Sequence, residues 1–179
     1  MRRAIGVSII TAILLVIAFP ASASSPHFKR GGQPTCTISG GGTSKSVVCS
    51  ASLTGLGNED LDIDLTVGGF AVYQCQNAGG NIAPGQNKVL VGPVTAPTTI
   101  PADQIKNGNV SFTTNPATLT APSTVTGAEA GCPNPHWTGV NPTLTVTSIT
   151  LDISQGGTLL FHCTASNQSG LSSPVALGC

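Results

Sequence analysis

Short apolar windows recur along most of this chain, separated by Gly, Pro and Asn, and they predict β-strands. The clearest is 143–153, where Leu, Val and Ile alternate with Thr and Ser, with one phase shift at Ser148. The Gly156-Gly157 pair joins it to 158–165 and predicts a hairpin. The other expected strands are 35–39, 47–54, 61–76, 88–94 and 109–114.

The window 61–76 is too long for one flat strand, and Gly68-Gly69 in its middle predicts a bulge or bend. Residues 102–106 predict one helical turn, and the prolines between 93 and 142 predict loops or edge strands. About seven short strands with frequent turns predict an all-β fold, a two-sheet antiparallel sandwich that we expect to be immunoglobulin-like. A closed barrel is the alternative.

The N-terminus has the layout of a cleavable signal peptide. Two arginines precede a 16-residue largely apolar run, 4–19, and Ala21-Ser22-Ala23 follows as a small-x-small cleavage site. A transmembrane anchor is the alternative, but it needs about 20 apolar residues. We therefore expect a secreted, bacterial protein with no membrane association after cleavage. Its expected parts are a signal peptide (1–23), a disordered mature N-terminus (24–33) and a single β-sandwich domain (34–179).

The charge of the mature chain is small. Of the seven basic residues, Arg2 and Arg3 leave with the signal peptide, so five bases face seven acids and the net charge is 5 − 7 = −2. Nucleic acids and anionic membranes require a clustered basic surface, so neither is an expected partner. No cofactor is expected, because no nucleotide- or metal-binding motif is present.

Six cysteines follow the cleavage site, and an even number in an oxidising compartment predicts three disulfides. There is no C-x-x-C pair, so no metal site is expected. The cysteines are Cys36, Cys49, Cys75, Cys132, Cys163 and Cys179.

The spacing of the cysteines favours one pairing. Cys36 and Cys49 flank the turn at 40–42 and can meet across a hairpin, while Cys163–Cys179 would hold the C-terminal tail. Cys75 and Cys132 then remain, each at the start of a Pro/Gly/Asn-rich loop. The competing scheme joins Cys49 to Cys163, as a bridge between the two sheets.

Two groups of polar residues raise the question of a site. Asp60, Asp62 and Asp64 share one face of a strand and could hold Ca²⁺, but same-face neighbours lie about 7 Å apart, so we favour a solvated face. A hydrolase would need a histidine near a serine and a carboxylate, with His136 or His162 the best candidates. No catalytic motif accompanies them.

The aromatic residues give a second type of candidate. Tyr73 and Trp137, the only Tyr and the only Trp, could stack together on sugar rings if they were exposed. The alternative is core packing, because a buried Trp against a disulfide is a hallmark of immunoglobulin-type sandwiches.

One loop and one later segment carry a resemblance. Residues 75–87 read C-Q-N-A-G-G-N-I-A-P-G-Q-N, and residues 132–137 read C-P-N-P-H-W. This resembles an uncharacterised group of small secreted proteins of actinobacteria and related soil bacteria, which have a C-x-N-x-G-G-N-x-x-P-G-Q-N loop, a C-P-N-x-x-W segment and a Q-G-G turn. The resemblance implies a fold and export without an activity, and it supports pairing Cys75 with Cys132.

The expected function is that of a non-enzymatic extracellular module that binds an unidentified extracellular ligand, such as a glycan or another envelope component, through its loops. The loops 77–87 and 131–141 would form the binding surface. The alternatives are a secreted hydrolase that uses a histidine and a disulfide-anchored protease inhibitor. The expected ligand-binding residues are Tyr73, Asn81, Asn87, His136 and Trp137.

Overall fold

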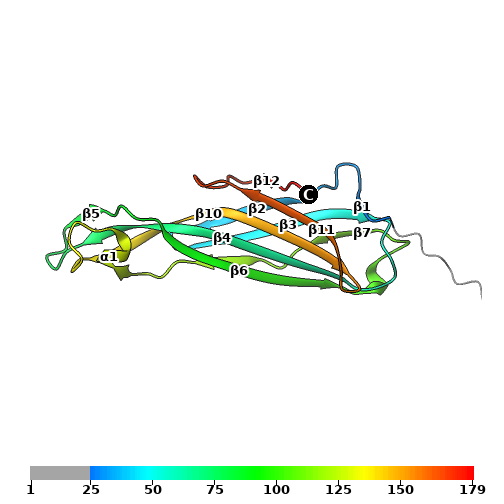
Figure 1. The fold of residues 1–179 in the computed structure, drawn as a ribbon, viewed down its shortest axis with the longest axis horizontal. Helices are drawn as coiled ribbons and strands as arrows, with labels where there is room; N and C mark the ends of the chain where they lie inside the picture. The colour runs from blue at the N-terminus through cyan, green and yellow to red at the C-terminus, as the bar shows by residue number, and fades with distance from the viewer. Residues whose placement is uncertain (1–24) are drawn as a thin grey trace, which may run out of the picture.

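The computed structural model describes residues 25–179, so the expected signal peptide lies outside the described residues. The described chain forms two antiparallel sheets that pack against each other in an elongated sandwich (Figure 1). The expected all-β, two-sheet architecture is confirmed, and the closed-barrel alternative is wrong. The immunoglobulin-like detail stays a prediction.

The first sheet has β3 at its centre. β2 and β1 pair with one edge of β3, and β12 pairs with the outer edge of β2. β7 and β8 pair with the other edge of β3. Its strands are β1 (His27–Phe28), β2 (Thr35–Gly41), β3 (Ser44–Thr54), β7 (Val110–Thr113), β8 (Ala117–Thr120) and β12 (Val175–Ala176).

The second sheet is built on two long strands, β4 and β10. β11 and β9 pair with the outer edge of β10, and β6 and β5 pair with the outer edge of β4. Its strands are β4 (Leu61–Gln76), β5 (Ile82–Pro84), β6 (Val89–Ile100), β9 (Val125–Thr126), β10 (Thr138–Gln155) and β11 (Thr158–Ser166). The helices of the described residues are one turn each, η1 (Ala102–Gln104) and α1 (Gly127–Ala130), and η1 confirms the expected helical turn.

The β4–β10 pair runs from Leu61 opposite Gln155 to Gln76 opposite Thr138. Along β4 the odd-numbered side chains face the core and the even-numbered ones face solvent or the sheet surface. Asp62 and Asp64 are exposed, as the amphipathic pattern predicts. The largest fully buried side chains of this pair are Leu61, Ile63, Leu65, Val67, Tyr73, Ile149, Leu151 and Ile153.

A bulge interrupts the pair at the predicted glycines. Gly68 lies opposite Ser148 and Gly69 opposite Val146, so Thr147 is the extra residue. This extra residue explains the phase shift at Ser148. A Cβ on Gly69 would lie 2.2 Å from the carbonyl oxygen of Thr145, so only glycine fits there.

Several strand bounds differ from the prediction. β6 continues to Ile100 and β10 begins at Thr138, because pairing with the long β4 extends both strands beyond their apolar windows. The prolines of β6 agree with the expectation of an edge strand, since β6 pairs only with β4 among the described strands. The shortest strands, of two to four residues, leave too short a pattern to recognise.

The expected disorder of 24–33 is wrong for the described residues of that segment. His27 and Phe28 pair with β3, the Lys29 N–H donates to the Ser52 carbonyl at 2.9 Å, and Ser52 N–H donates to the Gly32 carbonyl at 2.9 Å. β2 pairs with β3 only as far as Ser50, which leaves this edge of β3 free. Phe28 anchors the segment by its ring contact with Phe161, with centroids 4.5 Å apart.

The three disulfides follow the favoured pairing. Cys36–Cys49 joins directly opposed residues of β2 and β3, Cys75–Cys132 joins the end of β4 to the loop after α1, and Cys163–Cys179 holds the tail against β11. The Cys49–Cys163 alternative is wrong. Among residues 25–179 there is no helix with the length and apolar character that crossing a bilayer requires.

The glutamine of the Q-G-G turn, Gln155, is buried and has a structural role. Its side chain accepts from the Gly57 N–H at 2.8 Å and donates to the carbonyls of Gly57 and Glu59 at 3.2 and 2.8 Å. One side chain therefore satisfies three backbone groups of the turn before β4, and it connects that turn to the β10–β11 hairpin.

Replacing Gln155 by Ala should lower the free energy of unfolding by about 1–3 kcal/mol, because three part-buried backbone groups lose their partner. Chemical denaturation measures this. The control Gln168→Ala, at an exposed position, should change stability by less than about 0.5 kcal/mol. Equal effects of the two substitutions would contradict the role assigned to Gln155.

Replacing both Cys75 and Cys132 by Ala should destabilise the chain more than replacing both Cys36 and Cys49. The bridges span 57 and 13 residues in sequence. On the chain-entropy model their removal costs ~4 and ~3 kcal/mol. Denaturation of the two double variants tests the order, and a larger loss for the Cys36/Cys49 variant would contradict it.

Candidate binding site at the loop end

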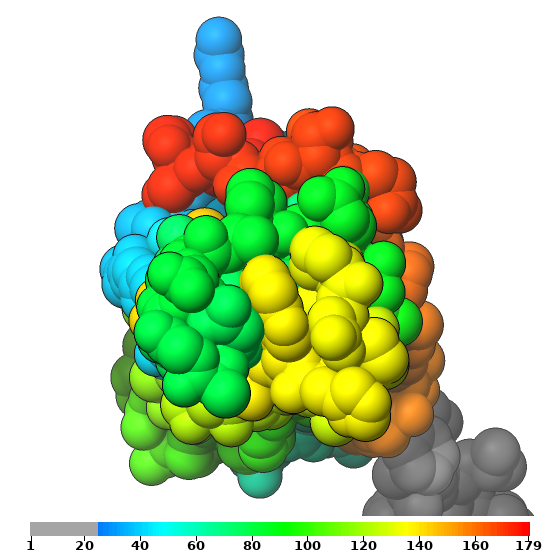
Figure 2. All heavy atoms as spheres, turned by 90° about the vertical axis from the view of Figure 1, so that its left-hand side faces the viewer, coloured from blue at the N-terminus to red at the C-terminus, as the bar shows by residue number. Residues whose placement is uncertain are grey.

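One end of the sandwich is formed by residues 77–87 and 127–137, which we call the loop end. Figure 2 faces this end and shows the two segments side by side, in green and yellow. The N–H groups of Gln86 and Asn87 both donate to the Ala130 carbonyl, at 3.0 and 3.2 Å. Together with Cys75–Cys132, these bonds bring together the two loops in which the sequence predicted a binding surface.

The helical turn α1 is held by a capping box. The Glu129 N–H donates to the Thr126 hydroxyl oxygen at 3.2 Å, while Glu129 Oε2 accepts from the Thr126 N–H at 2.9 Å and from its hydroxyl at 2.7 Å. Gly131 ends the turn in the left-handed conformation, with φ of 67°. The sequence signal of this turn is Thr126-x-x-Glu129, a capping-box pattern.

Hydrogen bonds from Thr126 lower the pKa of the Glu129 carboxyl below its usual 4.5. A lowered pKa means that the carboxylate form is favoured in the folded chain. The contribution of this carboxylate to stability is therefore present above pH 4.5 and is lost as the pH falls through the lowered value. The loop end carries a fixed negative charge at neutral pH.

Trp137 is half-buried, so it can both pack against the core and contact a ligand, the two roles that the sequence left open. Part of the side chain packs against the core. The residue also lines an open groove of ≈ 600 Å³, which we call the Trp137 groove. The other lining residues are Pro122, Thr124, Val125, Thr126, Gly127, Glu129, Pro135 and Thr138. The groove therefore combines an indole, two prolines, three threonines and one carboxylate.

Tyr73 does not share a stacking surface with Trp137, and its predicted contact with a ligand is wrong. Its side chain is only 1% exposed, and its hydroxyl donates to the Pro122 carbonyl at 2.9 Å. Tyr73 therefore supports the groove residue Pro122 from inside the domain. Burial and the nearby Glu129 charge both raise the pKa of the Tyr73 phenol above 10.0.

The other predicted ligand-binding residues have different surroundings. The Asn87 side-chain amide donates to the carbonyls of Ala128 and Glu129 at 3.3 and 3.1 Å, so it holds α1 in place. Asn81 is exposed in a turn closed by the Asn77 side chain. His136 is exposed next to Trp137, but it does not line the Trp137 groove.

A second hollow, of ≈ 610 Å³, lies between β5 and the β4–β10 pair. The side-chain amide of Asn141 donates to Gln74 Oε1 at 2.9 Å, and Ile82, 46% exposed, forms an apolar wall. Asn141 has a positive φ of 51° where a second register shift interrupts β10. The sequence analysis missed this hollow, although Asn141-Pro142 within a strand pattern is a signal for such an irregularity.

The histidines do not form a triad in the described chain. His162 Nδ1 lies 2.5 Å from Asp152 Oδ1, and both side chains are well exposed on the outer face of the second sheet. No serine hydroxyl among residues 25–179 hydrogen-bonds to a histidine ring. The geometry therefore adds nothing to the hydrolase alternative.

The acidic residues just before and within β4 make local hydrogen bonds. Asp62 accepts from the Thr99 hydroxyl at 2.7 Å, and Asp60 accepts from the Ala102 N–H at 2.8 Å. Within residues 25–179 there is no group of three or more Asp, Glu, His or Cys placed to hold a metal ion.

No family model, curated protein sequence or solved structure matches this chain, so its site is interpreted from its own geometry.

Tyr73 supports the groove residue Pro122 from inside the domain, so the pKa of its phenol depends on the packing beneath the groove. Because Tyr73 is the only tyrosine, a tyrosine titration measures this one group. Alkaline titration by ultraviolet absorbance should place its ionisation above pH 10.0, and Glu129→Gln should lower the midpoint by removing a nearby negative charge. A raised pKa favours the neutral phenol in the folded chain. Its contribution to stability is therefore present below pH 10.0 and is lost as the pH rises through the folded value. An ordinary midpoint, insensitive to Glu129→Gln, would contradict this account.

Proposed function

We propose that this protein is a secreted, non-enzymatic module that binds a glycan in the Trp137 groove. The observation that carries the proposal is that a half-buried Trp137 lines the same open groove as three threonines and one carboxylate. An indole face packs against the C–H face of a sugar ring, while hydroxyls donate and accept hydrogen bonds around its edge and a carboxylate accepts them.

The surroundings of the groove support binding at a preformed site. α1 is held by its capping box and by the Asn87 amide, and the loop after it is joined to β4 by a disulfide. Tyr73 fixes Pro122 on one wall. A site whose walls are already ordered loses little conformational entropy on binding.

Three further observations support the wider proposal. Disulfides form and persist in oxidising compartments, and all six cysteines are paired, which favours export. Catalysis is disfavoured because the His–carboxylate pair found among residues 25–179 lies on an exposed sheet face, outside the groove. The single acidic residue of the groove favours a neutral or cationic ligand over an anionic polymer.

A protease inhibitor is the second candidate, and one observation favours it. Residues 133–136 form a continuous exposed loop that is tied to β4 at Cys132. An exposed, disulfide-anchored loop can enter a protease cleft with little loss of entropy. Incubation of the full chain with extracellular serine proteases distinguishes this role, because inhibition would occur without any glycan.

Binding should depend on Trp137. A glycan array identifies a ligand, and calorimetric titration then compares the wild type with Trp137→Ala, Trp137→Phe and Leu90→Ala. Trp137→Ala should weaken binding about tenfold, which is ~1.4 kcal/mol, and Trp137→Phe should weaken it less. Leu90→Ala is the control, because Leu90 is a large exposed side chain on β6, outside the groove.

The ligand should also change the fluorescence of Trp137, the only tryptophan. If Trp137→Ala lowered the melting temperature but left the affinity unchanged, Trp137 would be a packing residue and the proposed site would be wrong.

A further inference from the structure

The outer face of the first sheet is made almost wholly of serine and threonine. Solvent-facing residues of β2, β3, β7 and β8 are opposed in register, so their hydroxyls form rows across the sheet. We call this surface the hydroxyl face. Its residues are Thr35, Thr37, Ser39, Ser44, Ser46, Ser50, Ser52, Ser111, Thr113, Thr118 and Thr120, with Val48 among them.

The hydroxyls are arranged in two directions, across neighbouring strands and along each strand. Thr35, Ser50 and Thr113 are opposed across three strands, and Ser39, Ser46 and Thr118 form a second such row. Neighbouring strands lie about 4.8 Å apart and same-face residues of one strand about 6.7 Å apart. The face therefore presents repeated rows of hydroxyls, interrupted once where Thr37 lies opposite the apolar Val48.

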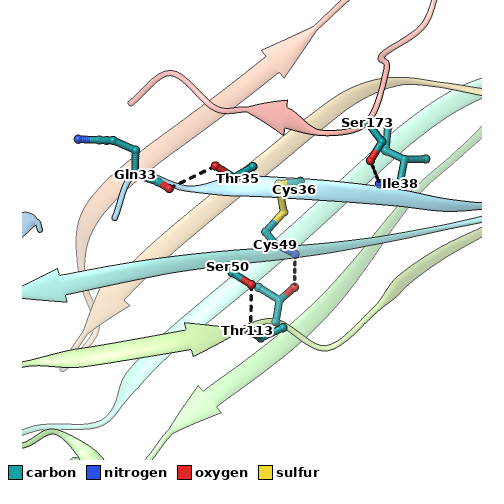
Figure 3. Close-up of a disulfide and its surroundings, with 9 residues drawn as sticks. Gln33, Thr35, Cys36, Ile38, Cys49, Ser50, Thr113 and Ser173 are labelled. Atoms are coloured by element: carbon teal, nitrogen blue, oxygen red, sulfur yellow. Dashed lines mark hydrogen bonds between the residues drawn. A yellow bond between two sulfur atoms is a disulfide. The ribbon is translucent and has the colours of Figure 1, made fainter. Parts of the chain in front are cut away.

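Hydrogen bonds and a disulfide hold these rows in place. The hydroxyls of Ser50 and Thr113 lie 3.0 Å apart, and those of Ser52 and Ser111 lie 2.8 Å apart. Figure 3 shows the Ser50–Thr113 bond beside the Cys36–Cys49 disulfide, which joins β2 to β3 on the buried side of the sheet. The rows are thus ordered before they meet a partner.

The chemistry of the hydroxyl face excludes most classes of partner. None of its residues is charged, so nothing on it attracts nucleic acid or an anionic membrane. It has no aromatic side chain, because Phe112 of β7 points into the core. Aromatic and arginine anchors usually carry protein interfaces. A sugar-binding surface would also be expected to offer an aromatic ring, as the Trp137 groove does.

We propose that the hydroxyl face binds ice. An ice surface is a neutral lattice in which every oxygen both donates and accepts hydrogen bonds, and each serine or threonine hydroxyl can do the same. Repeated, pre-ordered rows can hold surface waters at repeating positions, whereas scattered hydroxyls cannot. The row Thr35–Ser50–Thr113 lines an open hollow of ≈ 430 Å³ beside residues 31–33, where waters held by the hydroxyls can bridge to the crystal.

The second sheet offers a matched control surface. Its outer face also contains one row of threonines, formed by Thr95, Thr66, Thr150 and Thr164. The neighbouring row contains Asp64, Asp152 and His162, so this face is charged and lacks repeated rows of hydroxyls.

The test is uptake of the full mature chain into slowly growing polycrystalline ice, alongside an inert protein of similar size. The wild type should be enriched in the ice and should inhibit recrystallisation. Ser50→Lys/Thr113→Lys should lose the enrichment, while Thr95→Lys/Thr164→Lys, which adds the same charge to exposed positions of the other face, should keep it. Ser50→Ala/Thr113→Ala is a milder second variant and should lose part of it. Circular dichroism melts confirm that each variant is folded.

Any of four results would overturn the proposal. Three of them are exclusion of the wild type from ice to the level of the inert protein, equal loss in both lysine double variants, and binding to crystalline cellulose or chitin that Ser50→Lys/Thr113→Lys abolishes while ice uptake is absent. Dimerisation that depends on Ser50 and Thr113, seen by sedimentation without ice uptake, would assign the face to a second copy of the chain and would also overturn it. Loss of glycan binding in Trp137→Ala has no bearing on this test, because Trp137 lies outside the hydroxyl face.

Discussion

The antiparallel pairing of β4 with β10 is the constraint on which the rest of the structure depends. The two strands are 16 and 18 residues long and pair from one end of the sandwich to the other. Their inward side chains form the centre of the core, and every other described strand of the second sheet pairs with one of them. Because the side-chain period of a strand is two, a slip of one residue would turn the aspartates of β4 into the core, so the register is strongly determined.

The same pair positions the candidate site. β4 ends at Cys75 and Gln76, beside the disulfide that holds the loop after α1, and β10 begins immediately after Trp137. Tyr73, an inward residue of β4, reaches the carbonyl of Pro122 and supports the groove wall. The site therefore lies on loops, but each of its walls is connected to the longest strands of the domain. This is the usual arrangement of binding loops on a rigid scaffold.

Much of the fold could be predicted from the residue pattern of short stretches of the chain. The bounds of β4, the bulge at Gly68-Gly69 and the Cys36–Cys49 hairpin bridge all depend on residues close together in sequence, where period and turn chemistry are informative. Tyr73 was misjudged although the signal was present, because it shares the odd-numbered, inward face of β4 with Leu61 and Cys75.

Other features depend on distant segments. β1 forms because an edge of β3 is left free, and the Trp137 groove brings together residues 122–138 over the end of β4. Asn87 was expected at a ligand, and only the position of α1 shows that its amide is already engaged. The hydroxyl face requires the registers of four strands, which no single strand pattern contains.

Hydrogen–deuterium exchange of the native chain tests most directly whether the β4–β10 pair continues as a rigid support into the loop end. If it does, the amides of 70–76 and 138–146 that take part in the pairing will exchange as slowly as those of 61–67 and 149–155 in the middle of the core. Rapid exchange confined to 70–76 and 138–146, with the remainder protected, would contradict this account, because the loop end would then open independently of the sandwich and the Trp137 groove would not be preformed.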